Sequence, residues 1–248
     1  MKKILLLQSF LLAAILVTGC RILPVSGDAP LDVLVVSGGH RYDTVPFLAM
    51  FDAMEGVVYD TMLQPRANRM IARKEVDDYD AIVFYDAWRE LSEKEKQGYR
   101  HLTRKGQGLV FLHHALGSYQ HWEGFSDMVG GRYYRKGSGH TGKPFMEYKH
   151  DIDIMVQVVN RDHPVTRNMP NFTIRDEGYK NLVYEEGIEP LLRTGHPRRS
   201  DTIAWTFDAR RSEVVYLMLG HDHHAYENPH YRELLRNAIF YTAGRLDQ

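Results

Sequence analysis

The chain has 248 residues, a formal net charge of −1 at pH 7 and a single cysteine. The balanced charge argues against general binding of nucleic acid or of a membrane surface through a basic face. The single cysteine excludes an internal disulfide, and the length suits one α/β domain, with a division into two domains as the alternative.

The first residues have the organisation of a secretory signal peptide. The two lysines after the initiator methionine supply positive charge, and the apolar run at 4–17 is shorter than the ~20 apolar residues that a spanning helix needs. The run leads into the sequence Val-Thr-Gly-Cys ending at Cys20, which resembles the bacterial lipobox, in which the cysteine is lipidated. An ordinary signal peptide with a chance cysteine is the alternative. We therefore expect a lipoprotein signal peptide over residues 1–20.

Cys20 is the expected lipidation site, and residues 21–30 are the expected tether to a domain over residues 31–246. A lipid anchor would make the membrane a partner of the protein and place it in the cell envelope, periplasmic or at the outer membrane. Arg21, rather than an aspartate, follows the cysteine, which favours the outer membrane. Several acyl chains hold a protein firmly at a membrane, whereas one chain holds it weakly.

The residues from 31 to 112 predict alternating strands and helices. Their short apolar runs are typical of buried parallel strands, and Ser92 with Glu95 three positions later forms a capping box. Strands are expected at 31–37, 57–62, 80–85 and 108–112, and helices at 44–54 and 92–105. This order predicts an α/β fold with a doubly wound, mostly parallel sheet.

The second half of the chain predicts a less regular architecture. Residues 133–186 are rich in Gly, His and Tyr and predict an irregular antiparallel insertion. Further strands are expected at 152–159, 203–207 and 214–219. Asn228 can cap and Pro229 can open a final helix that ends at Gly244.

Ligands of doubly wound sheets bind beyond the carboxyl ends of the parallel strands, where strand order switches. Three predicted loops lie at such ends, at 38–40, 86–88 and 113–114. The two glycines before His40 would let a ligand approach the backbone. Trp88 in the second loop has the aromatic ring needed to stack on a sugar, although packing in the core is an equal alternative.

His113 and His114 occupy the turn after a buried strand, where many α/β enzymes carry a nucleophile. No cysteine stands at that turn, so cysteine-dependent amidotransferase chemistry is excluded, and Ser118 would need an offset turn. The two histidines suit acid–base catalysis or metal binding. Neighbouring side chains at a strand end point in opposite directions, so one of the pair is alternatively a core residue bonded to the backbone.

A second histidine group follows the strand at 214–219 and contains His221, His223 and His224. On an extended segment His221 and His223 would face the same side. A helix-entry capping network and a chance polar loop are the alternatives. Glu177, two residues before Tyr179, could act as a general base or a metal ligand, although acidic residues are usually solvated. Histidines from three strand ends are expected to meet at one rim of the sheet.

Several segments resemble the ThuA-like (trehalose utilisation) family. They are VVSGGHRYD (35–43), KGQGLVFLHHALGSYQHW (105–122), VGGRYY (129–134), HPVTRNMP (163–170), RDEGYKNL (175–182) and LGHDHHAYENPHYRELLRNAIFYTAGR (219–245). The resemblance implies a flavodoxin-like fold related to class I glutamine amidotransferases, without the amidotransferase nucleophile. It also implies a link to trehalose or 3-keto-sugar metabolism.

We expect an extracytoplasmic carbohydrate-active enzyme that acts on a sugar or keto-glycoside by acid–base chemistry. The candidate catalytic residues are His113, His114 and Glu177, and the candidate substrate-binding residues are His40, Trp88, Tyr179 and His224. The candidate metal ligands are His40, His221 and His223, with a divalent metal such as Zn²⁺ as the candidate cofactor. The alternatives are a non-catalytic sugar-binding lipoprotein, whose histidines would not converge, and a metal-dependent hydrolase of another substrate.

Overall fold

The computed structural model describes residues 29–88, 90–197 and 200–246. The expected signal peptide, the lipidation site Cys20 and nearly all of the tether lie outside the described residues. Within those three ranges, none of the helices combines the length and the hydropathy that crossing a membrane requires.

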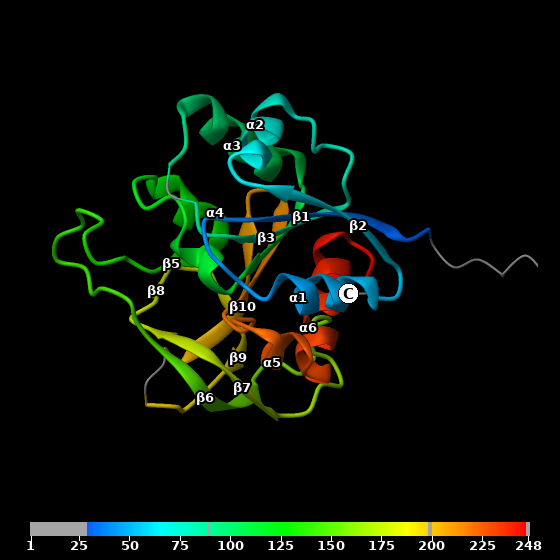
Figure 1. Cartoon of the computed structure of the whole chain (residues 1–248), viewed down its shortest axis with the longest axis vertical. Helices are drawn as coiled ribbons and strands as arrows, with labels where there is room; N and C mark the ends of the chain where they lie inside the picture. Colours follow the sequence, from blue (N-terminus) through cyan, green and yellow to red (C-terminus); the bar gives the residue numbers. More distant parts are fainter. Residues whose placement is uncertain (1–28, 89, 198–199, 247–248) are drawn as a thin grey trace, which may run out of the picture.

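Within the described residues, nine strands form one sheet in the order β2-β1-β3-β4-β11-β10-β9-β6-β7 (Figure 1). They are β1 (Leu31–Gly38), β2 (Val57–Leu63), β3 (Ala81–Asp86), β4 (Gly108–Leu112), β6 (Glu147–Val158), β7 (Phe172–Lys180), β9 (Glu189–Arg193), β10 (Thr202–Ala209) and β11 (Ser212–Leu217). The strands from β2 to β11 in this order run parallel, and β10, β9, β6 and β7 extend the sheet with antiparallel pairs.

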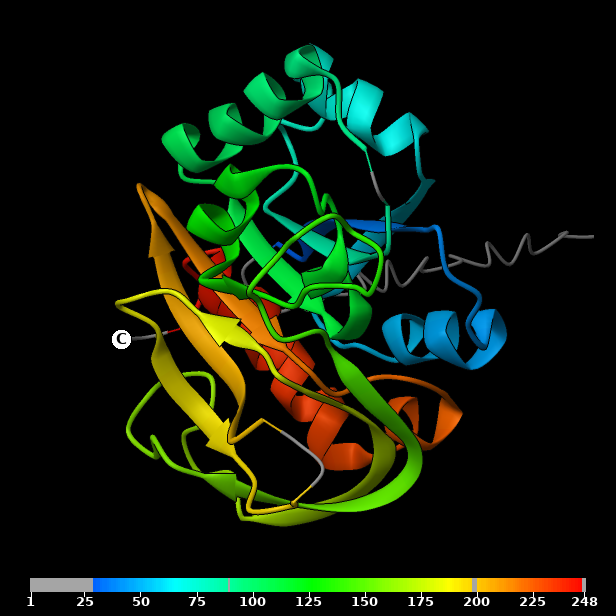
Figure 2. The same cartoon turned by 90° about the vertical axis from the view of Figure 1, so that its left-hand side faces the viewer.

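Helices cover both faces of the sheet, as Figures 1 and 2 show. The helices of the described ranges are α1 (Thr44–Asp52), α2 (Arg66–Arg73), α3 (Glu93–Lys105), α4 (Ser126–Val129), α5 (His223–Tyr226) and α6 (Pro229–Thr242), with 3₁₀ turns η1 (His113–Gly117) and η2 (Glu123–Phe125). Helix α6 packs on β3, β4 and β11, with α5 against α6 and α1 against α5. Helices α3 and α4 pack on the other face of β11, with α2 against α3.

The parallel half of the sheet follows directly from its apolar runs. Every residue of β3 and β4 is buried, as expected of strands covered by helices on both faces. The capping box at the start of α3 is present, because the Ser92 hydroxyl accepts from the Glu95 N–H and the Glu95 carboxylate accepts from the Ser92 N–H. The predicted α/β class and doubly wound sheet are confirmed.

The antiparallel part differs from the expected insertion in one respect. Strands β6 and β7 form a long hairpin that is an edge of the main sheet, since β6 pairs with β9. The irregular stretches within the expected insertion include 133–146, before β6, and 159–171, between β6 and β7. Strand β5 (Gly131–Arg132), just before the first of them, pairs with β8 (Val183–Tyr184), which follows β7, as a small separate ladder. The hairpin brings residues of β7 next to the carboxyl ends of the parallel strands.

Those carboxyl ends lie side by side at one rim. Gly38 of β1 is in register with Asp86 of β3, and Leu217 of β11 is in register with Leu112 of β4. The loop after β1 approaches the loop after β3 closely at Gly39, whose φ is +78°. A Cβ at this position would lie only 2.7 Å from the Ala87 carbonyl oxygen, so the approach requires a glycine. The loops that carry His40, His113 and His221 therefore share one edge.

Candidate functional site

His113 stands at the turn between β4 and η1 with a left-handed φ of 49°. Its imidazole Nδ1 lies 2.7 Å from the Met218 carbonyl oxygen. A carbonyl oxygen only accepts hydrogen bonds, so the ring proton is assigned to Nδ1. The lone pair of Nε2 is therefore directed toward residues of β7 and of the loop after β11.

Three ligand-type atoms converge there. His113 Nε2 lies 3.0 Å from Glu177 Oε2 and 3.2 Å from His221 Nδ1, and the latter two atoms are 3.1 Å apart. His113 and Glu177 are buried, whereas His221 is partly exposed. We call these three side chains the histidine–glutamate cluster. Two lone-pair atoms as close as His113 Nε2 and Glu177 Oε2 require a cation between them, either a proton or a metal ion.

Asp176 holds β7 in position for this convergence. Its buried carboxylate accepts hydrogen bonds from the backbone N–H groups of Gly220 (2.7 Å), His221 (2.9 Å) and Glu177 (2.8 Å). Burial raises the pKa of the Asp176 carboxyl, and these backbone donors oppose that rise. Asp176 thus ties β7 to the loop after β11, and Glu177 is directed at His113.

The electrostatics of the cluster favour an ionised Glu177. Burial acts to raise the pKa of the Glu177 carboxyl, but the hydrogen bonds and charges of His113 and His221 outweigh it and hold that pKa far below its usual value. Burial likewise acts to lower the pKa of His221, but the hydrogen bond with Glu177 outweighs it and raises that pKa. His150 Nδ1 lies 3.1 Å from the other carboxylate oxygen, Glu177 Oε1.

Tyr179 completes the surroundings of His113. Its hydroxyl oxygen lies 2.7 Å from His113 Nε2. Burial raises the pKa of Tyr179 well above its usual value, so the phenol remains protonated. It can donate to Nε2 only while that nitrogen's single lone pair is not bound to a metal ion.

A pocket of about 280 Å³ opens beside the cluster. Its lining includes His40, His114, Arg135, His150, Glu177 and Tyr179. The His40 ring stacks on the His114 ring, with ring centroids 4.3 Å apart. The pocket therefore joins residues from the loops after β1 and β4 to residues of the β6–β7 hairpin.

His114 presents an unsatisfied nitrogen within this pocket lining. Its Nε2 lies 3.3 Å from the Tyr85 carbonyl oxygen, to which it donates, and its buried Nδ1 has no hydrogen-bond partner among the described residues. Burial lowers the pKa of His114 well below its usual value. The imidazole is therefore neutral at physiological pH, with a free lone pair on Nδ1.

Two of the three expected metal ligands do not join the cluster. His40 stacks on His114, and its ring centroid is 6.5 Å from that of His221. His223 is exposed, and its Nδ1 lies 2.9 Å from Asp43 Oδ2. The expectation that His221 and His223 face the same side is wrong, because Asp222 caps α5 and places His223 in the first turn of a helix.

Two of the expected substrate-binding residues, His224 and Trp88, do not line the pocket beside the cluster. His224 is exposed and its Nδ1 lies 3.1 Å from Asp222 Oδ1, outside the pocket lining. Trp88 packs against the hydrophobic core, and its carbonyl accepts a hydrogen bond from the Tyr119 N–H. By contrast, His40 and Tyr179 line the pocket, as do His114 and Glu177.

The cluster is suited to a divalent metal. Two imidazoles and a carboxylate form a donor set that binds Zn²⁺ and other transition metals. Donor atoms about 2.1 Å from a metal are separated by about 3.0 Å in octahedral and about 3.4 Å in tetrahedral geometry. The three separations of 3.0–3.2 Å fall in this range. The hydrogen bond from His113 Nδ1 to a backbone carbonyl is also the usual outer support of a metal-binding histidine.

The sequence reasoning missed His150 and the role of Asp176. His150 lies where β6 is irregular, between the pairs Lys149↔Gly178 and Ile152↔Asp176. In the observed register this position lies opposite residue 177. No local pattern in the sequence indicates this register, because the first half of β6 is exposed and lacks an apolar run.

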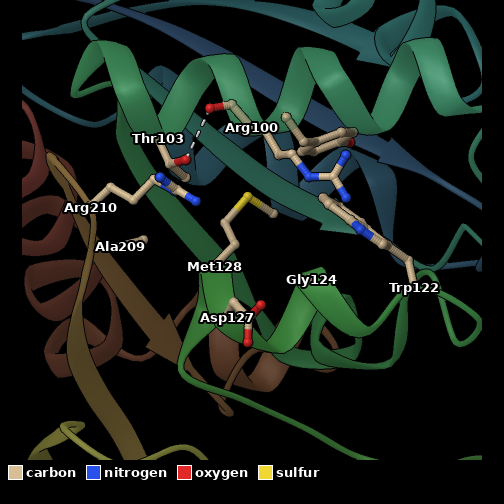
Figure 3. Close-up of a pocket in the computed structure, with 9 residues that line it drawn as sticks. Arg100, Thr103, Trp122, Gly124, Asp127, Met128, Ala209 and Arg210 are labelled. Carbon is tan, nitrogen blue, oxygen red and sulfur yellow. Dashed lines mark hydrogen bonds between the residues drawn. The ribbon is translucent and has the colours of Figure 1, made fainter.

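A second pocket lies elsewhere, between α3 and the segment that holds η2 and α4 (Figure 3). Arg100 lies over the Trp122 ring, with its guanidinium carbon 5.6 Å from the ring centroid. The lining contains Asp127 and Arg210 but no histidine. His40, His114 and Glu177 line the pocket beside the cluster, and none of them lines this second pocket.

Comparison with known proteins supplies a family match. The family model named ThuA, described as trehalose utilisation, matches residues 32–242. A comparison with curated proteins finds no match.

Solved structures share the fold. A ThuA-like protein of Parabacteroides merdae superposes with a TM-score of 0.73 at 16% sequence identity, covering 88% of this chain and 92% of that one. A ThuA-like protein of Bacteroides uniformis gives 0.66 at 19% identity, covering 88% and 93%. A glutamine amidotransferase of Thermotoga maritima gives 0.53 at 10% identity, covering 86% and 98%. At these identities the likeness concerns the fold alone.

Proposed function

Since this chain belongs to the ThuA (trehalose utilisation) family, we propose that it is a carbohydrate-active enzyme that acts on a sugar or keto-glycoside. The observation that carries the proposal is the convergence of His113, Glu177 and His221 from three separate segments to within 3.0–3.2 Å of one another. A protein that only binds sugar has no need of such a buried group of ionisable side chains.

Chemistry next to a sugar ketone needs a base for the carbon-bound proton and an electrophile for the developing oxyanion. Glu177 is a weak base, because its pKa is lowered and both of its oxygens have histidine partners. His114 is better placed, since its Nδ1 lone pair has no hydrogen-bond partner among the described residues, whereas both oxygens of Glu177 are engaged. We assign proton abstraction to His114.

The electrophile would come from the histidine–glutamate cluster. A divalent metal such as Zn²⁺ held by His113, Glu177 and His221 would supply Lewis-acid polarisation of a sugar oxygen. Asp176 orients this ligand set through the backbone of its neighbours. His40 and Tyr179 line the pocket at positions from which they can bind sugar hydroxyl groups.

The proposed location of the enzyme is outside the cytoplasm, with a lipid anchor on Cys20. This part rests on the signal-like residues 1–20 and on the absence of any other cysteine from the sequence. The sugar substrate would then be met in the cell envelope.

Turnover of keto-glycosides by the purified protein tests the activity. We expect conversion of a 3-keto-glucoside, followed by NMR, and a loss of at least ~100-fold in kcat/KM for His114→Ala and for Glu177→Gln. His224→Ala, an exposed histidine outside the pocket, should match the wild type. Binding without turnover in the wild type, or equal rates in all four proteins, would contradict the proposal and leave a sugar-binding protein.

A further inference from the structure

Arg135 is a cation in the wall of the pocket without a carboxylate partner. Its side chain lines the pocket beside the cluster, and also an adjoining pocket that contains Glu90, His121 and Lys136. The Glu90 carboxylate lies 3.8 Å from His121 Nε2. No carboxylate of the described residues forms an ion pair with it. Its Nε is buried and has no hydrogen-bond partner within the described ranges.

The position of Arg135 is fixed by its neighbours. Its backbone N–H donates to Gln120 Oε1 at 2.9 Å, and Gln120 Nε2 donates to the Tyr133 carbonyl at 3.0 Å. The guanidinium carbon of Arg135 lies 6.0 Å from the centroid of the Tyr133 ring. Tyr133 in turn donates its hydroxyl to the His114 carbonyl. Arg135 therefore stands next to the proposed proton acceptor.

The surrounding segment is basic. Residues 128–146 contain four arginines and lysines and no aspartate or glutamate, in a chain whose net charge is −1. Two of the four have other contacts, since Arg132 is buried and donates to the Trp122 carbonyl, and Lys143 lies over the Tyr134 ring. Arg135 and Lys136 are the two that line pockets.

The pocket therefore has the electrostatics of an anion site. Its single lining carboxylate, Glu177, already has histidine partners at both oxygens. A guanidinium binds carboxylate or phosphate oxygens through paired, charge-assisted hydrogen bonds. A neutral sugar would leave the Arg135 charge without a counter-ion in a partly desolvated wall.

We propose that the sugar substrate is anionic, and that Arg135 binds its carboxylate or phosphate group. The inference rests on the proposed function for the position of the catalytic centre. Arg135 thus determines which sugars bind, while His114 and the histidine–glutamate cluster carry the chemistry.

Calorimetric titration of the purified protein at low salt tests the proposal with three ligands that share a ring: glucose, glucuronate and glucose 6-phosphate. We expect at least one anionic sugar to bind about ten- to a hundredfold more tightly than glucose, with the preference falling as salt rises. Tighter binding of glucuronate would identify the recognised group as a carboxylate, and tighter binding of glucose 6-phosphate would identify it as a phosphate. Arg135→Gln should abolish the preference, and Lys143→Gln, in the same segment but outside both pockets, should retain it.

Equal affinity for glucose and both anions, no binding of either anion, or an unchanged preference in Arg135→Gln would overturn the inference. Its failure is distinguishable from failure of the proposed function. Turnover of neutral keto-glycosides without a charge preference would retain the enzyme and remove the anion site. An anion preference that depends on Arg135, without turnover of any keto-glycoside, would retain the anion site and contradict the proposed enzymatic activity.

Discussion

His113 adopts a backbone conformation that costs an ordinary side chain about 1–3 kcal/mol. The hydrogen bonds from the Tyr216 hydroxyl to its carbonyl and from its Nδ1 to Met218 hold it there. The position corresponds to the strand-to-helix turn at which many α/β enzymes place a nucleophile. Here the strained turn directs an imidazole lone pair toward Glu177 and His221 instead.

The same turn explains why both adjacent histidines are available to the site. On a straight strand one of them would point into the core. Because the chain enters η1 at His113, its ring faces Glu177 while the His114 ring stacks on His40. The sequence placed both histidines directly after the strand at 108–112, where they lie. The turn that directs both rings could not be predicted from the residue types.

Asp86 gives a pH-dependent prediction at the residue scale. Its carboxylate accepts from Gln64 Nε2 (2.9 Å) and the Tyr119 hydroxyl (3.2 Å), and burial raises its pKa to about 6. Between its usual pKa and this value the folded state holds a proton that the unfolded state has lost. Asp86 therefore lowers stability as pH rises through that window, by about 3 kcal/mol in all.

Asp86→Asn removes this titration while keeping an acceptor for Gln64 and Tyr119. Relative to the wild type, the variant should gain about 3 kcal/mol in unfolding free energy between pH 4 and pH 7. Urea unfolding across that range measures the difference, with the exposed Asp162→Asn as control. A wild-type-to-variant difference that stays constant with pH would show that Asp86 does not titrate as described.

At the scale of elements, the parallel half of the sheet was predictable because each strand is a local apolar run. The capping box at Ser92 and the Asn228–Pro229 start of α6 are likewise local signals, and both are present. The β6–β7 hairpin was harder, since the first half of β6 is exposed and lacks an apolar run. Its pairing depends on residues far away in the sequence.

The loop after β11 shows how one cap changes a site. Asp222 accepts from the His224 N–H and begins α5, which turns His223 and His224 away from the cluster. His221 precedes the capping residue in the chain, and its backbone N–H donates a hydrogen bond to the Asp176 carboxylate. The sequence identified the histidine group, but choosing His221 over His223 required recognising Asp222 as a helix cap.

At the scale of the whole molecule, the length of β7 (Phe172–Lys180) allows an edge strand to contact the loops at the carboxyl ends of the parallel strands. Glu177 lies on the edge strand of the sheet, yet its carboxylate meets His113 from the middle of the same sheet. The parallel strands thus carry His113 and His221, and the antiparallel extension carries the carboxylate. Neither half of the sheet contains the site alone.

The proposed membrane anchor is a property of the whole chain and depends on one atom, the Cys20 sulfur. We expect the wild-type protein expressed in a bacterium to sediment with the membrane fraction and to incorporate labelled fatty acid. Cys20→Ser should remove both properties, because the acyl chains have no other cysteine to occupy. Equal membrane association and labelling of the two proteins would contradict lipidation at this residue.

The most direct test of the account is the metal content of the protein, purified without a polyhistidine tag and measured by mass spectrometry. We predict stoichiometric divalent metal in the wild type and in His223→Ala, and its loss in His221→Ala, because only His221 joins His113 and Glu177. A metal-free wild type, or metal retained in His221→Ala and lost in His223→Ala, would contradict a metal centre at the histidine–glutamate cluster.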